Sequence, residues 1–154
     1  DWSSDVCSSD LRVVRVVPTV SMQAGLAAAV AFDPAVVADD NVSEMADVIE
    51  GVRTGAVARA SRDADFGGVA VREGDWLALE EGVAVATDAE PVGAVRALVE
   101  RLLAEPRGIL TVLLGEGAPD LTSLLAEVTE RHPNVELDVH EGGQPHYAVL
   151  LAAE

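Results

Sequence analysis

The sequence lacks lysine and has very few thiols and aromatic side chains. Its ten basic residues are all arginine, and Cys7 is its single cysteine. One thiol can form no internal disulfide and no zinc site built on several cysteines. The longest apolar stretches, such as residues 25–32, fall far short of the ~20 residues that a membrane-spanning helix needs. These absences exclude a disulfide scaffold, a cysteine-based zinc site and membrane insertion.

The first eleven residues, DWSSDVCSSDL, show no apolar periodicity and no basic or apolar signal-peptide region. Back-translated, they resemble sequencing-adapter DNA read in frame; the alternative is a natural tail rich in Ser and Asp. We expect residues 1–11 to be a non-structural artefact. Without their three aspartates the net charge of −17 becomes −14. Such an acidic chain repels phosphate backbones and anionic lipid, which argues against nucleic-acid or membrane-surface binding and favours a cytoplasmic protein.

Residues 12–40 predict only a small amount of structure. Arg12 to Pro18 has the pattern of a short buried strand, and Met22 to Phe32 that of a helix rich in small residues, ended by Asp33-Pro34. One strand and one helix cannot enclose a core. We therefore expect residues 12–40 to be the remnant of a preceding subdomain, an orphan strand and helix.

Residues 41–154 have the pattern of a complete C-terminal α/β domain. Asn41 is placed as the N-cap of a helix, with Glu44 three residues later, and Gly55 as its C-terminal stop. An apolar stripe at helical spacing predicts the packed face of this helix. The stripe consists of Val42, Met45, Ala46, Ile49 and Val52.

The rest of this domain alternates between strand and helix patterns. Short alternating runs over residues 55–87 predict an antiparallel meander, and Pro91 and Asp120 each mark the start of a helix. Three later strands are expected at Ile109–Leu114, which should be central, at residues 135–140, and at Tyr147–Ala153. The predicted fold is α/β, a mixed sheet with an antiparallel meander and about three packed helices.

The segment HEGGQPHY, residues 140–147, concentrates the strongest candidate site residues. Its glycines permit close backbone approach, its histidine titrates near neutral pH, and its amide and phenol can orient a polar ligand. A plain hairpin turn explains the same residues, and we weight that reading about two to one. The candidates here are His140, Gly142, Gly143, Gln144 and Tyr147.

Weaker candidates lie elsewhere. Arg62 and Asp63, with Asp65 nearby, could position an anionic group, although an ion pair that fixes the turn is the simpler reading. Glu136, Asp138 and His140 share one strand face, which permits metal ligation but equally describes a solvated face. We assign no metal and no catalytic residue.

Nucleotide binding and nucleophilic catalysis find no support in the motifs. The loop GEGAPD (115–120) lacks the Lys-Ser/Thr of a phosphate cradle, and Asp120 brings negative charge to the helix start. A Gly-x-Ser-x-Gly motif is absent, and so is a cysteine nucleophile outside residues 1–11. A small hydrolase or phosphatase that uses His140, Asp75 and Arg62 stays as the enzymatic alternative.

Four motifs carry a family resemblance. They are VVPTVSMQAGLAAAVAFDP, NVSEMADVIEGVRTGAVARASRDA, VREGDWLALEEGVAVA and NVELDVHEGGQPHY. In order and spacing they resemble the C-terminal region of the dihydroxyacetone-kinase-like family, and more narrowly the large subunit of bacterial fatty acid kinase. The strongest pieces include Arg62-Asp63, the turn at Asp75, and Gly142-Gly143-Gln144 with Tyr147.

The resemblance implies a function for the chain and for a longer parent. In that family an N-terminal domain binds ATP and magnesium, so no cofactor is expected here. The C-terminal region is implicated in binding a DegV-type partner, whose fatty acid is phosphorylated for phospholipid synthesis. The resemblance thus implies a docking or scaffold region, with a homodimer as a further possibility, and makes the residues named above candidates for partner or ligand binding.

Overall fold

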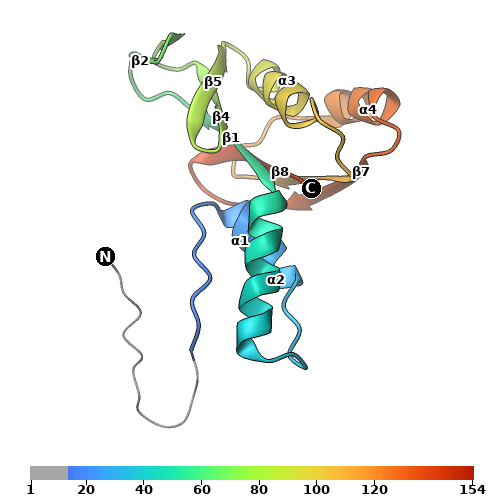
Figure 1. Ribbon diagram of the computed structural model, residues 1–154. Coiled ribbons are helices and arrows are strands. Elements are labelled where there is room, and N and C mark those ends of the chain that lie inside the picture. The colour runs from blue at the N-terminus through green and yellow to red at the C-terminus, as the bar shows by residue number, and fades with distance from the viewer. Residues whose placement is uncertain (1–13) are drawn as a thin grey trace. The chain divides into compact units, whose positions relative to one another are not determined.

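Figure 1 shows the computed structural model, which describes residues 14–154. The segment 1–11, expected to take no part in the fold, lies outside the described residues. The chain divides into two compact units, residues 1–52 and 53–154. The domain boundary expected at Asn41 stays a prediction, although the helix that contains Asn41 groups with the smaller unit.

The described part of the smaller unit consists of two helices, α1 (Met22–Val30) and α2 (Ala38–Gly51), which pack on each other. Ser21 caps α1, because its hydroxyl accepts a hydrogen bond from the Ala24 amide. The strand expected over residues 12–18 was wrong in its described part, since residues 14–18 have no regular structure. Val14 and Val16 are largely exposed. Without a neighbouring strand to accept its backbone hydrogen bonds, an apolar run does not become a strand.

Asn41 does not cap α2, contrary to expectation. The helix begins at Ala38, one turn earlier, and Asn41 is only 5 % exposed. Its side-chain oxygen accepts from the Asp33 amide at 2.8 Å, and its side-chain nitrogen donates to the carbonyls of Asp33 and Val36 at 2.9 and 3.0 Å. A cap and a loop anchor both require a short amide side chain beside unpaired backbone groups, so the sequence pattern could not separate them.

The larger unit is built on a six-stranded mixed sheet, counted within the described residues. Its strands are β1 (Arg53–Arg59), β4 (Trp76–Glu80), β5 (Val83–Asp88), β6 (Ile109–Leu114), β7 (Glu136–Glu141) and β8 (Tyr147–Ala153). Their order across the sheet is β5-β4-β1-β8-β6-β7. β6 and β7 run parallel, and all other neighbours run antiparallel. The α/β class and the mixed sheet are confirmed.

The meander expected over residues 55–87 is interrupted by a separate hairpin. β1, β4 and β5 pair in turn, but β2 (Ala64–Phe66) and β3 (Val69–Val71) form a two-stranded sheet of their own between β1 and β4. We call residues 60–75 the arm. Its base continues the main sheet, because the Ala60 amide donates to the Asp75 carbonyl at 2.8 Å.

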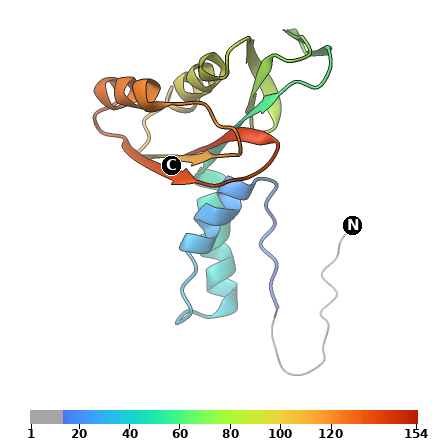
Figure 2. The same ribbon diagram turned by 180° about the vertical axis from the view of Figure 1, so that it is seen from behind.

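Helices α3 (Pro91–Leu102) and α4 (Thr122–Arg131) cover the same face of the sheet (Figures 1 and 2). The apolar positions that predicted the two helices lie against the strands, so the core lies between these layers. Its largest fully buried side chains are Leu98, Leu102, Leu110, Leu151, Val57, Val95, Val112 and Val149. Within residues 14–154, the structure contains no helix that is long and apolar enough to cross a membrane.

Gly55 does not end a helix, as the sequence suggested, but lies inside β1 beneath α3. A Cβ atom there would come within 2.7 Å of the Leu98 Cδ2 atom. The absence of a side chain lets the helix approach the strand closely. Helix α2 ends earlier, at Gly51.

Candidate functional site

One edge of the main sheet brings together the sequence candidates. β1, β5, β6 and β7 end at this edge, and β4 and β8 begin there, as the antiparallel and parallel pairings require. The arm, the loop 115–121 and the segment 142–146 therefore emerge from the same edge, which we call the loop edge. Connections that leave one edge of a rigid sheet are common places for binding sites.

The segment 142–146 is not a hairpin turn, because β7 and β8 are not neighbours. β6 lies between them, so the segment crosses over the end of β6. The amides of Gly142 and Gly143 donate to the Leu114 carbonyl at 2.8 and 2.9 Å, and the Gln144 side chain donates to the Leu113 carbonyl at 3.1 Å. The hairpin interpretation was wrong in topology, although these candidates do have a structural role.

Close packing explains the glycines at this crossing. A Cβ atom on Gly115 would collide with the carbonyl oxygen of Tyr147 and come within 2.8 Å of that of Gln144. On Gly142 it would collide with the Gln144 side chain. Gly143 has a φ of +62°, a left-handed conformation that favours glycine. The sequence singled out Gly142 and Gly143 but missed Gly115, which lay within a loop examined only for phosphate binding.

His140 lies on the exposed surface of β7. Its Nε2 atom is 2.8 Å from the Asp138 Oδ2 atom, and both side chains are about half exposed. Glu136 lies on the same strand face, yet among residues 14–154 no cluster of His, Cys, Asp and Glu side chains is arranged to hold a metal ion. His140 and Asp138 form a solvated pair.

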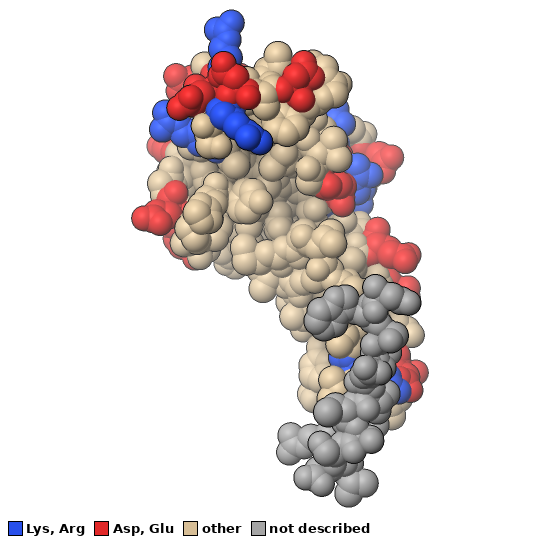
Figure 3. Space-filling model, turned by 90° about the vertical axis from the view of Figure 1, so that its left-hand side faces the viewer, with Lys and Arg blue, Asp and Glu red and all other residues tan. Residues whose placement is uncertain are grey.

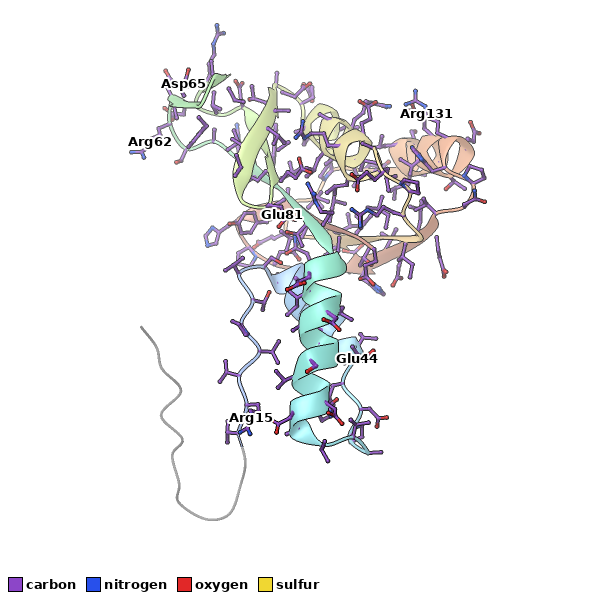
Figure 4. All side chains as sticks on the ribbon, viewed as in Figure 1. Arg15, Glu44, Arg62, Asp65, Glu81 and Arg131 are labelled. Carbon is purple, nitrogen blue, oxygen red and sulfur yellow. The ribbon has the colours of Figure 1, made fainter. Side chains whose placement is uncertain are left out.

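The arm candidates stabilise turns. Asp63 accepts from the Glu73 amide at 2.7 Å, Asp65 from the Gly68 amide at 2.9 Å, and Asp75 from the Arg72 amide at 3.2 Å. Arg62 forms no ion pair with any described residue and points away from the sheet (Figure 4). The ion pair expected for Arg62 and Asp63 is therefore absent from the described residues. Backbone amides satisfy the carboxylates instead.

Exposed aromatic side chains are a feature that the sequence did not reveal. Phe66 on the arm is 49 % exposed, and Tyr147 at the start of β8 is 41 % exposed. Charged residues of both signs gather over the arm (Figure 3). Aromatic residues bordered by polar groups are enriched at protein interfaces.

A groove opens beside the loop edge, between the end of β7 and the first turn of α4. It has a volume of about 540 Å³. Leu125, Val139 and Leu114 supply apolar surface, and Asp120 and Glu141 supply carboxylates. Its described lining contains no arginine. The hydrogen bonds from Thr122 lower the pKa of the Asp120 carboxyl below its ordinary value, which keeps the groove acidic.

The candidates share an edge but not a single site. Asp75 lies beside the start of β4, and His140 lies near the end of β7, four strands away in the order β4-β1-β8-β6-β7. At ~4.8 Å between neighbouring strands, four steps separate them by roughly 19 Å. The structure therefore does not bring Asp75, Arg62 and His140 together around one substrate.

Comparison with known proteins identifies the family. A protein of Staphylococcus haemolyticus is 36 % identical over 141 residues, and one of Staphylococcus aureus strain USA300 is 32 % identical over 141 residues; both bear the name "Uncharacterized protein". Each comparison covers 90 % of this chain but only 26 % of the relative, so the chain spans about a quarter of the length of these proteins.

A family profile matches almost the whole chain. The profile describes the C-terminal region of FakA-like proteins, in which FakA denotes a fatty acid kinase subunit, and it covers residues 4–154. This range includes part of the segment 1–11, whose origin as an adapter sequence stays a prediction. The chain belongs to the family of FakA-like C-terminal regions of fatty acid kinase.

Proposed function

We propose that this chain is the partner-docking and scaffold region of a fatty acid kinase subunit. The observation that carries the proposal is its membership in a family defined by the C-terminal part of such a subunit. In the whole subunit, ATP and magnesium would be bound by an N-terminal domain. The chain itself would work in the cytoplasm and hold a DegV-type fatty-acid-binding protein, so that the protein-bound fatty acid is phosphorylated for phospholipid synthesis.

The side chains of the loop edge support docking better than chemistry. Gln144, Asp63 and Asp75 form hydrogen bonds to backbone groups of the chain, which uses them to shape the surface. Phe66 and Tyr147 are exposed and available for apolar contact. A rigid surface with exposed aromatic residues suits a protein partner.

The hydrolase or phosphatase alternative gains no supporting observation. Its three residues, His140, Asp75 and Arg62, lie on parts of the fold that the sheet keeps apart. A general base must lie within hydrogen-bond reach of its substrate, and shared catalysis needs all groups around one substrate.

A pull-down tests the proposal. The chain, immobilised, should retain the cognate DegV-type protein and should not retain an unrelated lipid-binding protein. In the full-length subunit, His140→Ala should leave both partner retention and fatty acid phosphorylation unchanged, since His140 lies on an exposed strand face. Loss of turnover with unchanged partner affinity would favour chemistry at His140, and an intact C-terminal region that retained no partner would contradict docking.

A further inference from the structure

β7 is an edge strand with open hydrogen-bonding capacity. Within residues 14–154 it pairs only with β6. The amides of Glu136 and Gly142 donate to the carbonyls of Gly108 and Leu114, on the β6 side. Because backbone groups alternate in direction along a strand, those of Leu137, Val139 and Glu141 point outward, away from β6. Three residues thus present unpaired donors and acceptors along one line.

The other edge of the sheet is less accessible. β5 is the opposite edge strand, and both β3 of the arm and α3 pack against it. Beside β7 lies the acidic groove described above, with Val139 and Glu141 in its lining. Side chains on an extended strand alternate between two faces. A strand added to β7 would therefore direct every second side chain toward this groove.

We propose that the outer edge of β7, together with the acidic groove, binds an extended segment of a partner protein in which apolar and basic residues alternate. Backbone hydrogen bonds to Leu137, Val139 and Glu141 supply the pairing, as in other cases of strand addition. Apolar side chains contact Val139 and Leu125, and basic side chains approach Asp120 and Glu141. The proposal rests on the proposed docking function for the identity of the partner.

Charge decides between this partner and a second copy of the chain. β7 carries Glu136, Asp138 and Glu141 among its six residues. Pairing two copies of β7 would bring these carboxylates close together, and like charges on facing strands are destabilising. A basic segment meets the same carboxylates with favourable charge, so the edge selects a basic partner over self-association.

The test uses the whole chain and a short synthetic peptide in which lysine and valine alternate, with binding followed by the peptide's fluorescence anisotropy. Val139→Pro removes one outward amide and leaves the inward ladder to β6 intact, which proline tolerates at an edge strand. We expect affinity to fall about tenfold or more. Val139→Thr, which keeps the amide and the β-branched shape, should bind within about twofold of wild type.

A second variant keeps the test independent of the proline. Glu141→Lys should weaken the lysine peptide and strengthen a peptide in which glutamate alternates with valine, because it reverses one charge of the groove. Equal binding by wild type, Val139→Pro and Glu141→Lys would overturn the proposal, as would failure of folded wild type to bind the lysine peptide.

The partner protein separates this proposal from the docking function. If the DegV-type protein bound wild type and Val139→Pro equally, docking would stand and the role of the β7 edge would be overturned. If the lysine peptide bound as expected and the DegV-type protein did not bind, the edge would stand and the docking function would fall.

Discussion

Glu80 on β4 accepts two hydrogen bonds from Arg101 on α3, at 2.7 Å from Nη2 and 2.8 Å from Nε. The other carboxylate oxygen accepts from Arg53 on β1 at 2.6 Å. Glu80 is only 8 % exposed, whereas both arginines are about half exposed. One buried carboxylate thus connects two strands to the helix that covers them. A buried carboxylate is costly unless it is paired in this way.

Replacing Glu80 tests this link. Glu80→Gln keeps the shape but removes the charge and leaves donors facing donors, so the free energy of unfolding should fall by about 1–3 kcal/mol. Half-exposed arginines can regain water, which keeps the loss below that of a fully buried pair. Urea denaturation followed by circular dichroism measures it. Glu116→Gln, at an exposed loop position, is the control and should change little; equal stability of both variants would contradict the role of Glu80.

Acid should weaken the same link. Burial alone would raise the pKa of Glu80, but hydrogen bonds from Arg101 and Arg53 outweigh it and hold that pKa below its ordinary value of 4.5. A carboxyl with a lowered folded pKa contributes stability above its unfolded pKa and loses it as pH falls through the folded value. The free energy of unfolding should therefore fall below about pH 4.5. Denaturation at a series of pH values should show a shallower fall for Glu80→Gln than for wild type, and parallel curves would count against the account.

Glycine at position 115 should be irreplaceable. Gly115→Ala would force apart the carbonyls of Tyr147 and Gln144, and we expect a loss of about 2–3 kcal/mol in stability. Gly108 lies before the other end of β6, and a Cβ atom there would only reach ordinary contact, 3.8 Å from the Glu154 oxygen. Thermal unfolding of Gly115→Ala and Gly108→Ala compares them directly. A similar melting temperature for both would show that the segment 142–146 can move away.

Asn41 should stabilise the smaller unit through the loop it anchors. Asn41→Ala leaves the Asp33 amide and the carbonyls of Asp33 and Val36 without that side-chain partner, at an expected cost of about 1–3 kcal/mol. Faster amide hydrogen exchange over residues 33–41 would report it. Ser43→Ala removes only one exposed, 3.3 Å hydrogen bond and serves as the control. Unchanged exchange in Asn41→Ala would refute the anchoring role.

Sequence periodicity predicted those elements whose apolar faces are buried within the larger unit. The stripes on α3 and α4 and the continuous apolar run of β8 all mark burial, and the structure confirms them. The strand Ile109–Leu114 is also confirmed, as an interior strand next to the edge rather than a central one. Periodicity reports which face is buried but not which strand lies beside it.

The errors share that cause. The segment 142–146 looks like a hairpin because two strands flank it closely in sequence, and nothing local shows that β6 passes between them. Asn41 and Gly55 have residue types that suit helix ends, yet contacts with a loop and with Leu98 decide their roles. The groove is formed by residues from α4, β7 and the loop 115–121, so no single motif could indicate it.

The most direct test of docking is a calorimetric titration of the chain into the cognate DegV-type fatty-acid-binding protein. The account predicts saturable heat, with a fixed stoichiometry, that disappears when an unrelated lipid-binding protein replaces the partner. Absence of binding by this chain and by the intact C-terminal region of the full-length subunit would contradict it.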